Sequence, residues 1–438
     1  MQRVRYSGLG IRCARHDRLA WLLVVGVVLL DGCRCNDEPP LVTFETGSES
    51  TDDTTESGPN MDLPETESGE TETETETDTE TGETGVDSGC GDGVVAPGEL
   101  CFERINVAVG QSSGAIAVGD TNGDGILDVV VGQLDRAIVL LGVGDGGFSR
   151  PVVLASGGGV LGVAVGDLDN DQHADVIASV AEQDQVLVFL SQGDGSFAAG
   201  QGYMTGAAPR GLALADLGGT SALDLVVANE NSGDLSVLVG DGAGSFGIAT
   251  NYPAGSVPLA VAVADFNGDE LGDLVLADVG SDAAVVLLQD GGGFPLPVAH
   301  GVGSQPRAVA VADLDGDDAL DLVVPNQGSD DLSVLFGDGL GELVDEHVLL
   351  VGDTPRDVAL GDFDGDGILD IAVANRGEDR LGILIGDGAG GFAKQVNYGV
   401  IAGPIALAAG DVNGDGVDDV LVASSGGGGG VTLLVSSH

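Results

Sequence analysis

The sequence predicts an all-β protein, a seven-bladed β-propeller of four-stranded antiparallel blades that follows a disordered acidic linker. One observation is a repeat: an acidic nonapeptide recurs seven times, at intervals of 47, 49, 49, 48, 49 and 49 residues. The copies begin at Asp120, Asp167, Asp216, Asp265, Asp313, Asp362 and Asp411. A second observation is that each interval holds four short apolar runs divided by Gly- and Asp-rich turns, with no amphipathic helical pattern between them. A period this regular, built from strands, indicates blades repeated around an axis.

The apolar runs indicate how each blade is buried. In the fourth copy they are Leu259–Ala264, Leu274–Ala277, Ala284–Leu288 and a looser run near Leu296–Ala299. Runs such as Asp370–Ala374 lack polar alternation, which implies that both faces of the sheet are covered. Alanine and glycine are frequent in the first run of each copy. Small residues are expected there because the first strands converge near the axis.

The two ends of the repeat region are expected to share one blade. After the seventh nonapeptide the sequence supplies only the runs Val420–Ala423 and Val431–Val435. The segment Arg104–Val109 precedes the first nonapeptide, in the register of fourth strands elsewhere. We therefore expect this segment to complete the last blade, so that the ring has no open edge.

Composition limits the partners. The chain has 438 residues, with 71 acidic against 15 basic side chains and a formal net charge of −56. Nucleic acids and anionic lipid surfaces need basic patches, so neither is an expected partner. The acidic excess favours solvated tracts and the binding of cations.

Residues 1–32 have the pattern of an export signal. Five arginines precede the apolar run Leu19–Leu30, which is too short to span a membrane as a helix. The following Leu30-Asp-Gly-Cys33 resembles the bacterial lipobox, which implies lipidation of Cys33 and a lipid-anchored protein. Arg34 stands where an aspartate commonly retains lipoproteins at the inner membrane, so the outer membrane or cell surface is expected. Ordinary secretion with cleavage nearby is the alternative.

Residues 33–89 are expected to form a disordered tether. From residue 36 to residue 89 there are 18 acidic residues and no lysine or arginine, and threonine alternates with glutamate at the centre. Such a segment cannot bury enough surface to offset the entropy cost of ordering.

A short turn-rich loop, residues 90–101, follows the tether. Its first and last residues, Cys90 and Cys101, could form a disulfide outside the cytoplasm. Cys35 is left over, either free or intermolecular.

Residues 102–438 resemble the FG-GAP/VCBS repeat family, which includes the propeller of integrin α subunits. The resemblance rests on the pattern Asp-x-Asp/Asn-x-Asp-x-φ-x-Asp after a first strand, where φ is apolar. It also rests on later turns such as Gly240–Phe246 and Gly386–Phe392. It implies calcium-binding loops between the first and second strands, on one face of the ring. The connectors from fourth to first and from second to third strands then form the opposite face.

The nonapeptides suit calcium, which takes six to eight oxygen ligands and offsets repulsion among carboxylates. Side chains at positions 1, 3, 5 and 9 and the carbonyl at position 7 are the expected ligands, which gives about six Ca²⁺ sites. The predicted metal ligands are Asp120, Asn122, Asp124, Ile126 and Asp128; Asp167, Asp169, Asp171, His173 and Asp175; Asp265, Asn267, Asp269, Leu271 and Asp273; Asp313, Asp315, Asp317, Ala319 and Asp321; Asp362, Asp364, Asp366, Ile368 and Asp370; and Asp411, Asn413, Asp415, Val417 and Asp419. An EF-hand is excluded because valine, alanine or leucine stands at position 12. A solvated acidic turn without metal is the alternative.

Position 4 of the nonapeptide must turn the chain sharply. It is glycine in six copies and Asn170 in the second, and these residue types accept positive φ most easily. The third copy, Asp216–Asp224, departs from the pattern because Gly218 and Thr220 replace the acids or asparagine found elsewhere. We expect this copy to bind calcium weakly or not at all.

The sequence offers little for catalysis, and we expect no enzyme. Gly110–Gly114 matches G-x-S-x-G around Ser112, but no helical pattern follows, and the histidines are scattered. The leading hypothesis is a calcium-stabilised cell-surface scaffold for binding or adhesion. The alternatives are a catalytic propeller acting on polysaccharide, as a lyase would, and a purely structural surface protein.

A ligand site is expected on the face opposite the calcium loops, for a protein or glycan partner. Pro-Arg pairs in the fourth-to-first connectors place basic residues where the inner strands begin. The predicted ligand-binding residues are Arg210, Arg307, Arg356, Asn229, Asn326, Asn375 and Arg376. The alternative is that these arginines only pair with nearby acids. The membrane is expected to be contacted only through the N-terminal lipid.

Overall fold

The computed structural model describes residues 23–24, 27–28, 100, 102–110 and 112–436. The predictions for the lipidated Cys33, the tether and the Cys90–Cys101 loop lie outside these residues. Within the predicted export signal, only the short paired strands β1 (Leu23–Val24) and β2 (Val27–Val28) are described. No described helix combines the length and apolar character that crossing a membrane requires.

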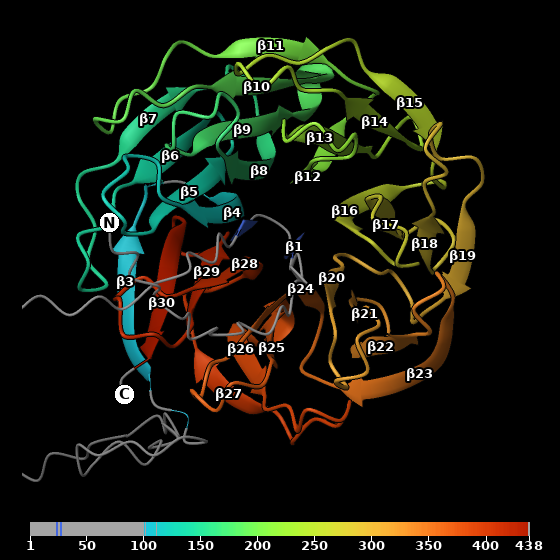
Figure 1. Ribbon diagram of the computed structural model, residues 1–438. Coiled ribbons are helices and arrows are strands. Elements are labelled where there is room, and N and C mark those ends of the chain that lie inside the picture. Colours follow the sequence, from blue (N-terminus) through green and yellow to red (C-terminus); the bar gives the residue numbers. More distant parts are fainter. Residues whose placement is uncertain (1–22, 25–26, 29–99, 101, 111, 437–438) are drawn as a thin grey trace, which may run out of the picture. The chain divides into compact units, whose positions relative to one another are not determined.

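From Phe102 to Ser436 the described residues form seven four-stranded antiparallel sheets arranged as the blades of a ring, which confirms the predicted fold (Figure 1). Blade 1 is β4 (Ser113–Gly119), β5 (Asp128–Gln133), β6 (Arg136–Leu140) and β7 (Val152–Ala155); blade 2 is β8 (Val160–Gly166), β9 (Asp175–Val180), β10 (Gln185–Phe189) and β11 (Gln201–Met204); blade 3 is β12 (Pro209–Ala215), β13 (Asp224–Asn229), β14 (Asp234–Leu238) and β15 (Thr250–Pro253). Blade 4 is β16 (Pro258–Ala264), β17 (Asp273–Asp278), β18 (Ala283–Leu287) and β19 (Val298–Gly301); blade 5 is β20 (Ala310–Ala312), β21 (Asp321–Asn326), β22 (Asp331–Gly337) and β23 (Leu343–Leu350). Blade 6 is β24 (Pro355–Gly361), β25 (Asp370–Asn375), β26 (Arg380–Leu384) and β27 (Val396–Gly399); blade 7 is β28 (Pro404–Gly410), β29 (Asp419–Ser424), β30 (Gly430–Ser436) and β3 (Phe102–Ala108). The 3₁₀ turns η2 (Ala181–Gln183) and η3 (Arg376–Glu378) lie between second and third strands.

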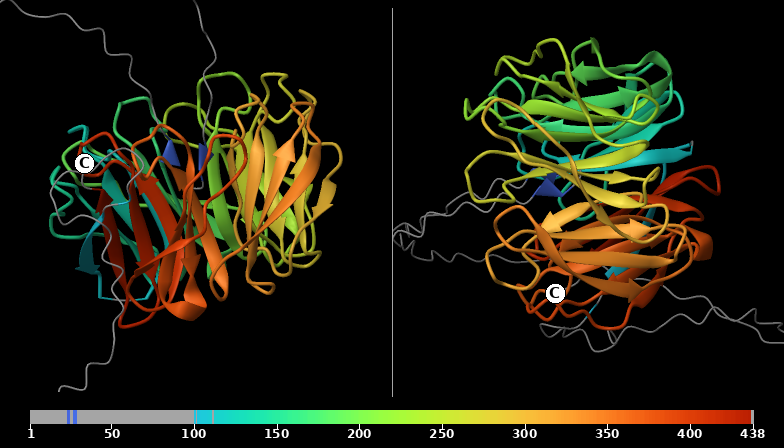
Figure 2. Two further views of the ribbon diagram at one scale, coloured as in Figure 1. Left: turned by 90° about the horizontal axis from the view of Figure 1, so that it is seen from below. Right: turned by 90° about the vertical axis from the view of Figure 1, so that its right-hand side faces the viewer.

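The strands run between two faces of the ring (Figure 2), and because the strands are antiparallel, each face carries a different pair of connectors. The connectors from first to second and from third to fourth strands lie on one face, which we call the loop face because it carries the nonapeptides. The connectors from second to third and from fourth to first strands lie on the opposite face, the connector face. Inner strands of seven residues separate the two faces by about 20 Å.

The hydrophobic core lies between the blades. The described residues form seven buried clusters, and each cluster joins one pair of neighbouring blades. The second strands are buried along their whole length, as in β13 and β25. Apolar residues at successive positions therefore pack on both faces of each sheet, which explains the absence of polar alternation in the sequence.

The ring is closed as the sequence predicts. β3 pairs with β30 in antiparallel register from Phe102–Ser436 to Ala108–Gly430 and supplies the outer strand of the last blade. Phe102 also makes an edge-to-face contact with Tyr398 of blade 6, with ring centroids 5.4 Å apart. The segment therefore connects blade 7 to its neighbour as well.

One predicted boundary is wrong. The outer strand of blade 4 was expected near Leu296–Ala299, whereas β19 spans Val298–Gly301. Pro295 and Pro297 interrupt the earlier part of the run. Proline has no N–H to donate to a strand ladder, so pairing begins after it.

Candidate functional site

Each nonapeptide forms the loop between the first and second strands of its blade. Position 4 has positive φ in every copy, as the sequence predicts, from 62° at Asn170 to 80° at Gly414. Position 6 also has positive φ in every copy. The residue types do not predict this, because four copies have a residue other than glycine there. These are Gln172, Ser221, Glu270 and Asp318. The two left-handed positions fold the loop tightly around the first aspartate.

The acidic side chains organise the loop before any ion is considered. In blade 6 the Asp362 carboxylate accepts the amides of Asp366 at 3.0 Å and Gly367 at 2.9 Å. Asp366 accepts the amide of Ile368 at 2.8 Å. Each carboxylate oxygen has two lone pairs, so an oxygen that accepts one amide can still contact a cation.

The aspartate at position 9 is buried and clamps two backbone segments. In blade 6, Asp370 accepts the amide of Phe363 at 3.0 Å and that of Gly386 at 2.9 Å. The degenerate copy keeps this arrangement, since Asp224 accepts the amides of Leu217 at 3.0 Å and Gly240 at 2.8 Å. Position 9 therefore has a structural role that does not depend on the other metal ligands.

Three copies bring aspartates at positions 1, 3 and 9 together, with one oxygen from each within 4.8 Å of the others. These groups are Asp167, Asp169 and Asp175; Asp313, Asp315 and Asp321; and Asp362, Asp364 and Asp370. Burial, followed by the neighbouring charge at position 5, raises the pKa of Asp169, Asp315 and Asp364 at position 3. Burial also raises the pKa of the position 9 residues Asp175 and Asp370 to about 7.

Two buried carboxylate oxygens in these groups have no hydrogen-bond partner: Asp169 Oδ1 and Asp364 Oδ2. A buried charged oxygen without a partner is costly, and a cation would offset that cost. The donors are all oxygen atoms, the set that calcium prefers. The residues therefore fit calcium, which would neutralise the repulsion among positions 1, 3 and 9 and tie the two ends of the loop together.

Two of the three copies with asparagine at position 3 relieve the repulsion in a different way. Asn122 donates its side-chain amide to Asp124 at 3.0 Å, and Asn413 donates to Asp415 at 2.9 Å. These loops carry one negative charge fewer and one more internal hydrogen bond. The six predicted sites thus differ in how strongly they need a cation.

The side chain of His173, at position 7, makes contacts of its own in addition to the carbonyl that could bind a cation. Its Nδ1 lies 3.1 Å from Asp171 Oδ1, and its ring occupies the space that a Cβ on Gly123 or Gly193 would need. Gly123 belongs to the nonapeptide of blade 1, so the loops of neighbouring blades are in contact. Spacing along the sequence gives no sign of this contact.

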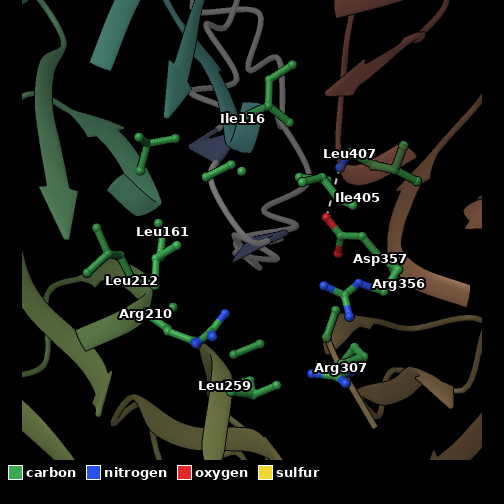
Figure 3. A pocket seen from close by; sticks show the side chains of 18 residues that line it. Ile116, Leu161, Arg210, Leu212, Leu259, Arg307, Arg356, Asp357, Ile405 and Leu407 are labelled. Atoms are coloured by element: carbon green, nitrogen blue, oxygen red, sulfur yellow. Dashed lines mark hydrogen bonds between the residues drawn. The ribbon is translucent and has the colours of Figure 1, made fainter. Parts of the chain in front are cut away.

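A cavity of about 140 Å³ lies in the central channel, and every blade contributes to its lining (Figure 3). Seven of the lining residues occupy the same register position, six residues before the nonapeptide of their blade. These are Gly114, Leu161, Arg210, Leu259, Arg307, Arg356 and Ile405. Arg210 and Arg356 lie where the register shifts at the start of β12 and β24. Such bulges re-aim side chains, which accounts for arginines that point into the channel.

The arginines differ in their partners. Arg210 Nε donates to Glu230 Oε2 at 2.5 Å, so the predicted alternative of pairing with an acid holds for this residue. Arg356 donates to the neutral Gln327 at 2.8 Å, and Arg307 Nε is buried without a partner. Burial and then the charges of the neighbouring arginines lower the pKa of Arg356 to about 10.

Asp357 is the carboxylate among the residues that line this cavity. Its two oxygens accept the amides of Leu407 at 2.8 Å and Val358 at 3.0 Å, so it joins blades 6 and 7.

Three asparagines predicted as ligand contacts are buried at the ends of second strands: Asn229, Asn326 and Asn375. Asn229 and Asn326 each hydrogen-bond an aspartate and a serine of their own blade. Their contact with a ligand stays a prediction.

Comparison with known families agrees with this geometry. A model described as the FG-GAP-like repeat matches residues 120–178, 216–276, 265–324, 320–373 and 362–422. The chain belongs to the FG-GAP-like repeat family. Four of the five matched segments begin at the first residue of a nonapeptide and run through the following nonapeptide, so the match of this FG-GAP-like protein follows the period of its acidic loops. No curated protein matches the chain.

Solved structures share the propeller fold with this FG-GAP-like protein at low identity. The virginiamycin B lyase of Staphylococcus aureus is 13% identical, covers 77% of this chain and 99% of its own, and superposes with a TM-score of 0.54. BBS1N in complex with ARL6DN is 12% identical, with 77% and 96% covered and a TM-score of 0.56. A lectin of Agrocybe aegerita that recognises non-reducing terminal N-acetylglucosamine is 21% identical, with 69% and 81% covered and a TM-score of 0.48. For the lyase and BBS1N, the likeness at such identities concerns the fold alone.

Proposed function

We propose that this protein is a calcium-stabilised scaffold at the cell surface, whose propeller binds a protein or glycan partner for adhesion. The observation that carries the calcium part is the set of three aspartate groups with oxygens within 4.8 Å of one another. The proposal extends calcium binding to the three copies with asparagine at position 3, because they keep aspartate at positions 1, 5 and 9. About six sites result.

Binding is favoured over catalysis by the chemistry of the channel. The charged residues that line the cavity are Arg210, Arg307, Arg356 and Asp357. The aspartate accepts two backbone amides and joins blades 6 and 7, so its place in the cavity has a structural explanation. Arginine stays protonated and cannot move a proton near neutral pH. A set of fixed donors of this kind suits recognition better than proton transfer.

The proposed location follows from the N-terminal sequence. A lipid on Cys33 would attach the protein to the outer membrane or cell surface, and the acidic segment 33–89 would hold the ring away from it. The lipid is the proposed contact with the membrane. With a net charge of −56, nucleic acid is not a proposed partner.

Calcium removal tests the proposal. Extracellular modules bind calcium with dissociation constants of about 0.1 to 1 mM, so about 1 mM free calcium stabilises each site by about 0.4 to 1.4 kcal/mol. Six such sites would contribute about 2.5 to 8.5 kcal/mol, comparable with the stability of a typical domain. The fragment 90–438 should therefore melt at a much lower temperature in excess chelator and recover when calcium is restored.

Partner capture is measured in the same two buffers. The immobilised fragment should retain surface proteins or glycans in calcium and release them in chelator. An identical melting temperature with and without calcium would show that the acidic loops are not structural calcium sites. Capture that persists after chelation would separate partner binding from the calcium-stabilised ring.

A further inference from the structure

The arginines in the channel are not required by the fold. The same register position is Gly114, Leu161, Leu259 and Ile405 in four blades and arginine in the other three. These blades have the same four-stranded order, and a buried apolar cluster lies between each pair of neighbours. A residue that the repeat does not need for folding, yet that recurs three times around one cavity, points to a role in binding.

Among the described residues, two of these arginines form no ion pair with a carboxylate. Arg210 has its ion pair with Glu230, whereas Arg356 donates to the neutral amide of Gln327 and the buried Arg307 Nε has no hydrogen-bond partner. Arg376 on η3 adds a further positive charge close enough to act on both. Asp357 is the carboxylate that lines the cavity, and its two oxygens accept the backbone amides of Leu407 and Val358.

The geometry of the cavity suits an anion. Figure 3 shows the guanidinium groups of Arg210, Arg307 and Arg356 directed into the same space, with Leu161, Leu259 and Ile405 around them. The planar fork of arginine matches the paired oxygens of a carboxylate or sulfate. The cavity has a volume of about 140 Å³, whereas a single water needs only about 10 to 15 Å³. Apolar walls strengthen each charged hydrogen bond by excluding water.

We propose that the channel mouth on the connector face is a binding site for an oxyanion, a carboxylate or sulfate group of the partner, held by Arg307 and Arg356. Arg210 orients the site from across the cavity while its charge is offset by Glu230. The inference rests on the proposed binding function and names the chemistry that the partner would present. It places the anion on the face opposite the candidate calcium loops, about 20 Å away.

Calorimetric titration of the full chain, in calcium and at constant ionic strength, tests this site. The probes are sodium sulfate, galacturonate and, as an uncharged counterpart, galactose. We expect sulfate or galacturonate to bind and galactose not to bind. Binding of sulfate alone would identify a sulfate group as the ligand, and binding of galacturonate alone a carboxylate. The Arg307→Gln, Arg356→Gln double variant should weaken anion binding about a hundredfold or more, because each of the two lost charge-assisted hydrogen bonds accounts for about tenfold or more in affinity.

The control is Arg150→Gln, which removes an exposed arginine on the loop face and should leave anion binding unchanged. Arg356→Gln alone should also weaken binding, so the test survives if the double variant fails to fold. The melting temperature in calcium should stay unchanged or rise slightly in both channel variants, because they remove repulsion. The site is refuted if neither anion binds, or if the anion binds the double variant as tightly as the unchanged protein. Neither result would alter the calcium dependence of melting, which tests the proposed function separately.

Discussion

At the residue scale, one aspartate in each repeat has two roles that can be separated. The position 9 carboxylate is a candidate calcium ligand, and it is also the acceptor for two backbone amides in its own blade. In blade 3 the metal-binding pattern is broken at Gly218 and Thr220, yet Asp224 remains buried and keeps both hydrogen bonds. The clamp therefore stabilises the blade whether or not a cation is bound.

Asp224→Asn should test the structural role of the position 9 aspartate in a blade where calcium is not expected to bind. An asparagine side chain offers one acceptor oxygen, so one of the amides of Leu217 and Gly240 would lose its partner, at a cost of about 1 to 3 kcal/mol. The free energy of unfolding in urea should fall by this amount equally in calcium and in chelator. Asp370→Asn is the matched variant, and it should lose more in calcium than in chelator. Equal losses in both buffers for Asp370→Asn would remove position 9 from the calcium ligands.

At the element scale, acidic loops of neighbouring blades are hydrogen-bonded to each other at two places in the ring. The amide of Ala174 donates to the carbonyl of Asp120 at 2.9 Å, and that of Asp418 donates to the carbonyl of Asp362 at 3.1 Å. Each of these bonds joins the loops of neighbouring blades. A cation that holds one loop closed therefore also supports the next blade, which explains why a surface loop is expected to affect the stability of the whole ring.

Asp364→Asn should make blade 6 resemble the copies that already carry asparagine. It removes a negative charge and the unpartnered oxygen Asp364 Oδ2. The unfolding free energy in chelator should rise by up to about 1 kcal/mol, and the additional stabilisation by calcium should shrink by about 1 kcal/mol. Thr220→Ala in the degenerate copy is the control and should leave calcium stoichiometry unchanged. A calcium-dependent shift as large in Asp364→Asn as in the unchanged protein would contradict this assignment.

At the scale of the whole molecule, closure of the ring depends on one strand from the beginning of the repeat region. β3 covers β30 along seven register pairs and contributes the partly buried Ile105 and Val107 to the cluster between blades 1 and 7. Without it β30 would be an exposed edge, and the seam between first and last blade would lose part of its packing.

Deletion of residues 102–108 should therefore destabilise the entire ring and not only blade 7. Burial of the apolar side chains of β3 contributes about 3 kcal/mol or more, so the urea midpoint should fall and unfolding should remain a single transition. Size-exclusion chromatography should show self-association through the exposed edge. A chain that begins at residue 100 is the control. An unchanged midpoint after the deletion would mean that β3 is an accessory strand and that the other blades close the ring.

Much of this organisation could be predicted from the sequence because it depends on local spacing. The period of about 49 residues gives the blades, the position 4 glycines and Asn170 give the turn, and Arg104–Val109 gives the closing strand. Each of these follows from the conformational limits of a residue type or from the regularity of the repeat. Proline placement in blade 4 was the exception, since Pro295 and Pro297 shift β19 towards the C-terminus.

Only the tertiary structure determines which side chains from different blades meet. Arg210, Arg307 and Arg356 lie 97 and 49 residues apart in the chain and meet only because seven blades return the same register position to one axis. The contact of His173 with Gly123, the unpartnered oxygens of Asp169 and Asp364 and the burial of Asn229 also depend on packing between or within blades. The physical reason is that spacing fixes the conformation of each repeat, whereas burial, charge pairing and convergence on a channel arise only when the repeats close into a ring.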